Sequence, residues 1–325
     1  MNLLFTSSGR RTQLIKYFKQ ELGNEGRIIV ADYNSTAPTL YIADKGYIVS
    51  SIDNSNYLNE IKEICTKEDI TGIIATIDPE LSLLAKEKEE FNNLGVQVII
   101  SDYDIVEMCF DKYSMFKFLK NNGFNTPKTY SNLDDFMNAL NKNKIDFPVF
   151  VKPREGSASI GINKVSTLEE LKILMKYNTD LIVQQYMQGQ EYGVDIYVDI
   201  ISKDVISIFL KKKISMRGGE TDKAVSVKND KLFNMILDFI KKLKVVGPVD
   251  IDVFEIDGEF YISEVNPRFG GGYLIAYECG ENFPKYILNN LKGIINTSHI
   301  DKYEEGIYMM RHDIVTIKKR CELLQ

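Results

Sequence analysis

The segment 250–268, which reads DIDVFEIDGEFYISEVNPR, decides the fold of this chain of 325 residues. Apolar and polar residues alternate on both sides of Asp257-Gly258, a dipeptide that is a strong signal for a β-hairpin turn. Glu264 and Asn266 are two residues apart, so their side chains share one face of the second strand. We therefore expect two antiparallel strands that present polar groups on one face.

The length of the hairpin turn decides whether the first strand adds acidic groups to that face. A two-residue turn would pair Asp252 with Ser263 and place the aspartate on the face opposite Glu264. A three-residue turn closed by a glycine bulge would pair Asp252 with Ile262 and Asp250 with Glu264, which places both aspartates on the Glu264 face. We predict the three-residue turn.

The polar face of this hairpin has the chemistry of a magnesium site. Mg²⁺ prefers one or two carboxylates together with phosphate oxygens and water. Arg268 projects to the same side, where it could hold a transferring phosphate. A solvated hairpin face is the other interpretation, since acidic residues are common on exposed strands. Four polar groups next to an arginine favour the metal site.

A second informative segment, 151–161, reads VKPREGSASIG. A strand ends in Lys152, and a loop of small residues with Gly156 and Gly161 follows, in which backbone N–H groups can converge on phosphate oxygens. The glycine spacing is that of a Walker A loop, but Lys-Ser/Thr does not follow Gly161. The segment is therefore not a P-loop. It fits a flap that folds over a triphosphate, with a plain hairpin loop as the alternative.

The first hundred residues alternate short apolar runs with helical patterns. Five runs read as buried strands: 3–5, 28–31, 47–49, 73–75 and 96–100. This alternation predicts a parallel sheet covered by helices on both faces. The turn after the first strand has one glycine, so the dinucleotide-binding pattern G-x-G-x-x-G is absent. Further along, the alternation over 192–200 predicts a strand with one solvent-exposed face.

Composition and charge exclude several classes of protein. The net charge of -6 argues against a nucleic-acid partner. No apolar run approaches the length that crosses a bilayer, and the N-terminal residues turn polar too soon for a signal peptide. The cysteines form no CxxC pair, which favours reduced thiols over zinc or disulfides. We expect a cytoplasmic protein without nucleic-acid or membrane partners.

Together these segments resemble the ATP-grasp superfamily, most of all the synthetase domains of carbamoyl-phosphate synthase large subunits and their stand-alone relatives. Asp111-Lys112, the lysine strand with its flap, and Glu264 to Arg268, which match the E-x-N-P-R signature, carry the resemblance. It implies an α/β chain: a Rossmann-like parallel-sheet domain of the pre-ATP-grasp type over 1–107, then a two-lobed α+β ATP-grasp domain over 108–325. The nucleotide lobe with the flap would span 108–188, and the metal and substrate lobe 189–325.

The resemblance also implies roles for individual residues. Nucleotide contacts would come from the two lysines, the flap, the hinge and a ribose-binding glutamate: Lys112, Lys152, Gly156, Ser157, Ser159, Gly161, Gln184, Gln185, Met187 and Glu191. Two magnesium ions, with manganese as an alternative, would be bound by Asp252, Glu264 and Asn266, with Glu264 bridging. The catalytic residues would be Lys152, Arg217 and Arg268, and Glu220 would help Arg217 to position phosphate and substrate.

Two residues depart from the pattern of the relatives. Gln184 stands where relatives usually carry glutamate, which affects one polar contact to adenine. Asp252 replaces the glutamine of carbamoyl-phosphate synthases, a change also found in members that resemble D-alanine–D-alanine ligase. The chain is one synthetase unit long, so we do not expect carbamoyl-phosphate synthesis itself.

The implied activity is an ATP-dependent ligation. A carboxylate would be activated as an acyl phosphate and coupled to an amine, with an amino acid as one candidate substrate. Two alternatives stay open: phosphoryl transfer to a small acid, as in kinases or carbamoyl-phosphate synthases, and a non-catalytic ATP-binding module. The relatives also suggest a homodimer.

Overall fold

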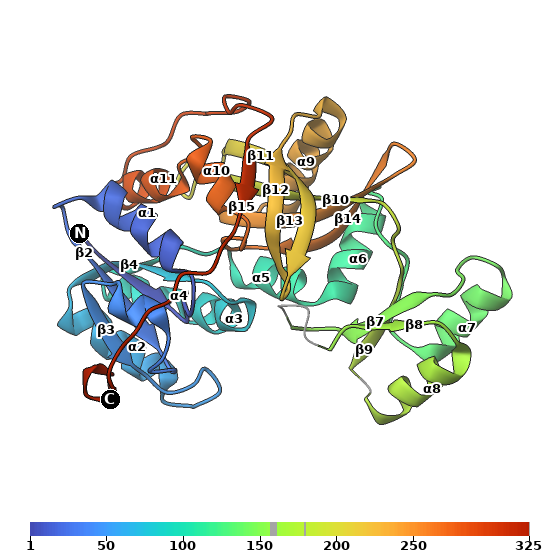
Figure 1. Ribbon diagram of the computed structural model, residues 1–325, viewed down its shortest axis with the longest axis horizontal. Helices are drawn as coiled ribbons and strands as arrows, with labels where there is room; N and C mark the ends of the chain where they lie inside the picture. The colour runs from blue at the N-terminus through green and yellow to red at the C-terminus, as the bar shows by residue number, and fades with distance from the viewer. Residues whose placement is uncertain (157–160, 179, 325) are drawn as a thin grey trace.

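A computed structural model describes residues 1–156, 161–178 and 180–324 of the chain. Over these residues the chain forms three sheets, which follow one another along the sequence (Figure 1). The N-terminal unit and the small middle lobe lie at opposite ends of the molecule, with the largest sheet between them (Figure 1). The chain therefore has the mixed α/β architecture that the sequence predicted.

The N-terminal sheet is parallel, as predicted, and its strand order is β3-β2-β1-β4-β5. Its strands are β1 (Asn2–Thr6), β2 (Arg27–Asp32), β3 (Lys45–Ile48), β4 (Ile70–Ala75) and β5 (Gln97–Val98). The helical segments are α1 (Thr12–Leu22), a 3₁₀ turn at Pro38–Tyr41, α2 (Tyr57–Lys67), α3 (Asp78–Lys86) and α4 (Lys88–Asn93). Successive strand residues face opposite sides, so Leu3 packs with α1 and Leu4 with α2.

The middle lobe is built on a four-stranded sheet of order β6-β9-β7-β8, and the two helices that precede it in the chain, α5 (Tyr103–Phe110) and α6 (Lys112–Asn121), pack on the large sheet. The strands of the lobe are β6 (Thr129–Tyr130), β7 (Val149–Pro153), β8 (Asn163–Val165) and β9 (Leu181–Gln185). Its helices are α7 (Leu133–Asn141) and α8 (Leu168–Tyr177). The expected domain boundary at 107/108 falls inside α5, and the expected lobe boundary at 188/189 falls between β9 and β10. Both boundaries stay predictions.

The largest sheet has six antiparallel strands in the order β14-β13-β10-β11-β12-β15. The strands are β10 (Gln190–Val198), β11 (Val205–Arg217), β12 (Glu220–Ser226), β13 (Gly247–Ile256), β14 (Glu259–Asn266) and β15 (Tyr308–Met310). The helical segments are α9 (Asp230–Leu243), α10 (Leu274–Glu278), α11 (Phe283–Leu291) and a 3₁₀ turn at Arg320–Glu322. Helix α9 covers one face of the sheet, and α1, α10 and α11 cover the other.

This double covering corrects one expectation about strand β10. The sequence predicted a wet face, but Asp195 and Tyr197 are both buried. Tyr197 packs against Phe283 of α11, and Asp195 forms a buried ion pair with Lys211. Helices that follow later in the chain bury this face, and a local alternation of polar and apolar residues cannot announce them.

The hairpin β13–β14 corrects a second expectation. The turn has two residues, Asp257 and Gly258, both with positive φ (52° and 77°). A β-bulge at Ser263 then shifts the register, so that Asp252 pairs with Glu264. The predicted three-residue turn is wrong, yet the acidic groups still share one face, because the bulge supplies the extra residue instead of the turn.

The C-terminal segment links the large sheet to the N-terminal unit. After β15 the chain runs past the N-terminal sheet, where Leu324 packs with Leu40 and Gly46 (Figure 1). The backbone N–H of Leu324 also donates to the Tyr41 hydroxyl at 3.3 Å. Among the helices over the described ranges, none has the length and apolar character that a bilayer span requires.

Candidate active site

A cleft of about 590 Å³ opens where the three sheets meet. Strands of the middle lobe and of the large sheet form two of its walls, and loops that follow β1 and β4 form a third. Most of the residues singled out in the sequence line it: Lys152, Gln184, Gln185, Met187, Glu191, Asp252, Glu264, Asn266 and Arg268. The fold thus gathers side chains from four separate segments of the chain around one space.

The remaining predicted residues fall into three groups. Lys112 lies at the base of the flap, where its ammonium donates to the carbonyl of Gly156 at 2.7 Å, and Gly161 closes the flap next to Pro153. Arg217 does not line the cleft; it pairs with Asp222 and Asp313 and lines a cavity that adjoins the cleft. Ser157 and Ser159 lie outside the described residues.

The carboxylate wall of the cleft comes from the β13–β14 hairpin. Asp252 and Glu264 are paired across the strands, and Asn266 is opposite Asp250. Burial raises the pKa of Glu264, and so does the neighbouring Asp252, while Lys152 opposes the shift. A second cation at this wall would therefore stabilise the ionised carboxylate.

The donor set at this wall fits a magnesium ion that is completed by phosphate. In the described parts of the chain, no three His, Cys, Asp or Glu side chains are grouped closely enough to hold a metal by themselves. The wall instead offers two facing carboxylates and one amide. Mg²⁺ is commonly bound in this way, with its other positions filled by water and substrate phosphates.

Lys152 faces the carboxylate wall from the middle lobe. It is the last residue but one of β7, and its side chain is buried. Burial lowers its pKa, Glu264 acts in the opposite direction, and Lys112 lowers it further. Two ammonium groups so close to each other favour an anion between them.

Lys213 is a site residue that the sequence did not reveal. Its ammonium lies 2.6 Å from a carboxylate oxygen of Glu191 and 2.6 Å from one of Asp252. Burial would lower the pKa of Lys213, but Asp252 and Glu191 raise it well above its usual value. The alternation of side chains along a strand could have pointed to it, since Lys211 and Lys213 are two residues apart and both face inward from β11.

The hinge between the lobes contains the residues expected to contact adenine. Gln184 is buried and its amide donates to the hydroxyl of Thr129 at 3.0 Å. The backbone N–H of Gln185 donates to the carbonyl of Lys128 at 2.8 Å. That N–H is therefore occupied, and an adenine contact at Gln185 would have to use another group.

Arg268 is held by the N-terminal unit. Its guanidinium donates two hydrogen bonds to one oxygen of Asp78, at 2.7 and 3.1 Å, and both side chains are largely buried. Arg11, in the loop after β1, donates to the carbonyl of Phe269 at 2.9 Å. Asp78 and Arg11 were missed as site residues, because about 190 residues separate Asp78 from Arg268 in the sequence and no local pattern joins them.

The flap is tied to α6 at its base. Asp111 accepts hydrogen bonds from the backbone of Tyr113 and Ser114, which begins the helix, and it also pairs with Arg154. Burial would raise the pKa of Asp111, but its hydrogen bonds with Arg154 and Ser114 lower it well below the usual value. The strand that carries Lys152 is thereby fixed to the helix that carries Lys112.

Comparisons with known proteins agree with this geometry. A family model described as ATP-grasp domain matches residues 109–272, and one described as PylC-like, N-terminal domain matches residues 3–99. Carbamoyl-phosphate synthase of Methanobrevibacter smithii is 25% identical over 321 residues, which cover 94% of this chain and 84% of that protein. D-alanine–D-alanine ligase of Bacillus anthracis is 25% identical over 288 residues, which cover 80% and 92%.

Other similarities cover only part of longer proteins or concern the fold alone. The matched region is 23% of the carbamoyl phosphate synthase large chain of Pseudothermotoga lettingae, at 26% identity over 273 residues. The biotin carboxylase domain of Hydrogenobacter thermophilus 2-oxoglutarate carboxylase, solved with MgADP, ADP and bicarbonate, has a TM-score of 0.75 at 15% identity. That alignment covers 94% of this chain and 73% of the other. Because the ATP-grasp model covers half of the chain and the fold agrees with it, the chain belongs to the ATP-grasp family, whose ligases use ATP and Mg²⁺.

Proposed function

We propose that this chain is an ATP-dependent carboxylate–amine ligase that works through an acyl phosphate. The observation that carries the proposal is the convergence in one cleft of Lys152, Arg268 and the carboxylate wall. Cationic groups on one side and carboxylates on the other suit a nucleotide triphosphate bound through magnesium. The names of relatives such as D-alanine–D-alanine ligase support coupling to an amine.

Asp252, Glu264 and Asn266 are the proposed metal ligands. With Glu264 between the other two, the set can hold two Mg²⁺ ions, and Mn²⁺ can replace them because it accepts the same oxygen ligands. When bound, the ions neutralise charge on the phosphates and polarise the bond that breaks. Lys213 holds Asp252 and Glu191 in place, and Glu191 lies where the ribose hydroxyls are expected.

The residues of the chain then divide the work of the two chemical steps. A carboxylate oxygen of the acid attacks the γ-phosphorus, and the bond to the β,γ-bridging oxygen breaks to release ADP. Lys152 and Lys112 offset charge on the phosphates during this transfer. The amine next attacks the acyl carbon, phosphate leaves, and the amine nitrogen loses a proton. Arg268, fixed by Asp78, is placed to hold the phosphoryl group through both steps.

The direct test is trapping of the acyl phosphate. Incubation with Mg-ATP, a carboxylic acid and hydroxylamine should release ADP and phosphate and yield the hydroxamate of the acid. Glu264→Gln should lower hydroxamate formation by about a thousandfold or more, because the metal loses a charged ligand. Glu259→Gln, at the exposed tip of the same hairpin, is the matched control and should leave the rate unchanged.

Product analysis separates this proposal from phosphoryl transfer without ligation. A ligase yields the amide, ADP and phosphate when acid and amine are both present, whereas a kinase-like enzyme accumulates a stable acyl phosphate whether or not an amine is added. The ligase proposal fails if wild-type protein binds Mg-ATP but no acid, with any amine or hydroxylamine, promotes ADP release.

A further inference from the structure

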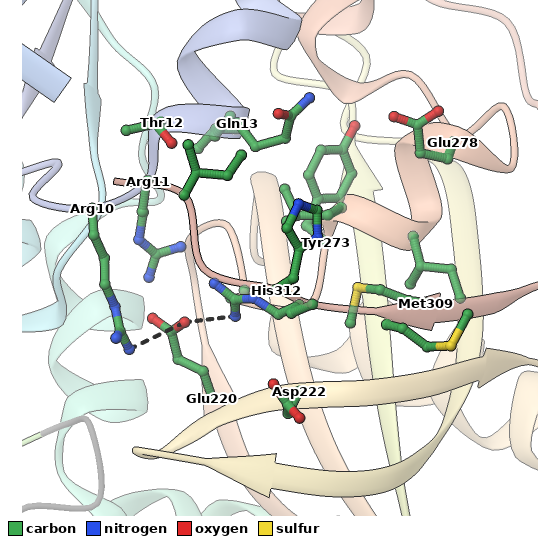
Figure 2. Close-up of a pocket in the computed structure, with 18 of the residues that line it drawn as sticks. Arg10, Arg11, Thr12, Gln13, Glu220, Asp222, Tyr273, Glu278, Met309 and His312 are labelled. Carbon is green, nitrogen blue, oxygen red and sulfur yellow. Dashed lines mark hydrogen bonds and ion pairs between the residues drawn. The ribbon is translucent and has the colours of Figure 1, made fainter. Parts of the chain in front are cut away.

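A second cavity of about 500 Å³ adjoins the cleft (Figure 2). Its walls are the first turns of α1, the helix α10, strand β12 and the segment 307–314. Four residues line both spaces and thus form the passage between them: Arg10, Arg11, Glu220 and Gly271. A ligand in the second cavity can therefore present one end to the phosphates in the cleft.

The passage is rich in arginine. Glu220 accepts a hydrogen bond from Arg311 at 2.6 Å and lies 3.3 Å from Arg10 (Figure 2). Burial would raise the pKa of Glu220, but Arg311, Arg10 and Arg11 together lower it. One carboxylate thus serves three guanidinium groups.

Arg11, at this passage, has N–H donors that can bind a ligand. Over the residues that the structure describes, its side chain makes one hydrogen bond, to the carbonyl of Phe269. Burial, and then the charge of Arg268, lower its pKa to about 10, although the carboxylates of Glu220, Asp78 and Asp250 act in the opposite direction. A guanidinium has five N–H donors, and a carboxylate is the planar partner that two of them can bind at once. Arg11 therefore keeps donors with which it can bind a carboxylate at the passage.

The walls beyond the passage combine apolar side chains with charged ones, and the charged residues are Arg217, Asp222, Glu278, Arg311 and Asp313. Leu14 and Tyr17 of α1 face Ile275 of α10, and Met309 and Met310 of β15 close the other side. A volume of about 500 Å³ lies within the range of pockets for small organic ligands, and it greatly exceeds the size of a bicarbonate ion. The apolar side chains favour a ligand with a hydrocarbon portion.

We propose that this second cavity is the binding site for the acid substrate, and that the acid carries an apolar stem. The carboxylate would lie between Arg10 and Arg11 at the passage, facing the nucleotide, and the stem would lie against α1, α10 and residues 307–310. This inference rests on the proposed ligase function, because it names the class of acid that the ligase takes. An amine that carries no carboxylate needs no such arginines, since its nitrogen must attack as a neutral group.

The chain contains no tryptophan, so a single one introduced at the cavity reports binding directly. Met310→Trp places the reporter on the cavity wall, and Ile317→Trp, at an exposed position outside the cavity, is the matched control. The probes are bicarbonate, acetate, hexanoate, 3-phenylpropionate, L-leucine and L-phenylalanine, each added with Mg²⁺ and a non-hydrolysable ATP analogue. Acids with a stem should change the emission of M310W, and I317W should not respond.

Kinetics on the same probes test the arginine passage. Arg10→Met should raise KM for the acid about tenfold or more at saturating ATP, because a charge-assisted pair is lost. Arg27→Met is the control, since Arg27 is also an exposed arginine, and it pairs with Glu68, which does not line the cavity. Arg10→Lys should recover part of the affinity.

The outcomes distinguish the two proposals. The second cavity is not the acid site if bicarbonate is the only acid that promotes ADP release. The same holds if an acid with a stem promotes ADP release but changes neither the emission of M310W nor, in R10M, the KM. In both cases the ligase function stands. A response of M310W to amines alone also overturns the assignment. If no acid promotes ADP release although Mg-ATP binds, the ligase function fails, and this inference fails with it.

Discussion

At the scale of single residues, Lys213 connects the ribose end of the cleft to its metal end. Replacing it with methionine leaves Glu191 and Asp252 facing each other without a counter-charge. Because both carboxylates keep about a quarter of their exposure, we expect K213M to lose about 2 kcal/mol of unfolding free energy rather than the 3–5 of a fully buried pair. Urea denaturation without metal measures this loss.

Magnesium should partly replace the missing ammonium of K213M. We expect added Mg²⁺ to raise the melting temperature of K213M more than that of the wild type, since a ligand stabilises the state that binds it better. Lys212→Met, one position along β11, is the control. Equal stability of K213M and wild type without metal would show that the two carboxylates do not depend on Lys213.

Asp199 gives a residue-scale prediction about pH. Its buried carboxylate accepts hydrogen bonds from the side-chain amides of Asn290 and Asn296, at 2.9 and 2.8 Å, and from backbone N–H groups of Ile201 and Ser202. Burial would raise the pKa of Asp199, but these bonds lower it. Its contribution to stability is therefore complete above the unfolded pKa of about 3.9, and it is lost as pH falls through the lower folded value.

Asp199→Asn should cost about 2–3 kcal/mol at pH 7, because an amide N–H₂ would face amide donors. The difference in unfolding free energy between wild type and D199N should shrink at pH 3.5, because the carboxylate of the unfolded chain, with a pKa of about 3.9, is then largely protonated. Asp204→Asn, on the same turn but exposed, should show neither effect. Urea titrations at the two pH values measure both, and a pH-independent difference would contradict the assignment.

Residues such as Lys213 and Asp78 mark the limit of sequence reasoning at this scale. The sequence revealed Glu264, Asn266 and Arg268 because they belong to one short motif and are spaced two residues apart, so that their side chains point to the same side. Lys213 acts through partners on two other strands, and Asp78 through a contact between separate units of the chain. Arg217 was expected at the cleft, but its side chain pairs with Asp222 and Asp313 and lines the second cavity instead.

At the scale of elements, the β13–β14 hairpin depends on its turn. Gly258 has φ of 77°, and a Cβ there would meet no atom within 4 Å, so only backbone strain opposes a side chain. Gly258→Ala should therefore cost about 1 kcal/mol of unfolding free energy and leave nucleotide binding unchanged. Thermal or urea unfolding measures the loss, with Glu259→Ala as control. A loss of metal binding in G258A would mean that the turn also sets the register of the strands.

The sequence predicted the hairpin and the face that its acidic side chains share. The prediction that a three-residue turn produces this face was wrong, because a bulge produces it. Hairpins with a longer turn and hairpins with a bulge differ little in local free energy. The choice between them depends on packing against β10 and α5. The wet face expected for β10 was wrong for a similar reason, since α11 covers it from a distant part of the chain. Periodicity predicts an element well and its neighbours poorly.

At the scale of the whole molecule, the pair Asp78–Arg268 joins the N-terminal unit to the catalytic wall. Asp78→Asn should lower kcat by about 10- to 100-fold through misplacement of Arg268, while ADP affinity changes little. ADP-release kinetics and calorimetry separate the two quantities, and Asp78→Glu should restore part of kcat. Asp53→Asn, exposed on the same unit, is the control, and unchanged kcat in D78N would remove the proposed positioning role.

The order of parts along the chain was the most predictable feature. Five apolar runs predicted the parallel sheet, and two motifs predicted the site. Both predictions were possible because each run and each motif is a pattern within one short segment. The packing of the units could not be predicted, because it depends on contacts between segments that are far apart in the sequence. This packing decides which loops of the first unit reach the cleft. The homodimer suggested by relatives stays a prediction that sedimentation equilibrium would test.

The bulge at Ser263 bears on how the hairpin tolerates changes in length. Residues 253–263 separate the two facing carboxylates, and one of these residues has no partner across the ladder. Losing or gaining a single residue on the β14 side gives an even number of residues between the two acids, so that Asp252 and Glu264 can pair around a two-residue turn without any bulge. Because β14 is an edge strand, the hairpin can be shortened or lengthened by one residue there while both acids stay opposite each other.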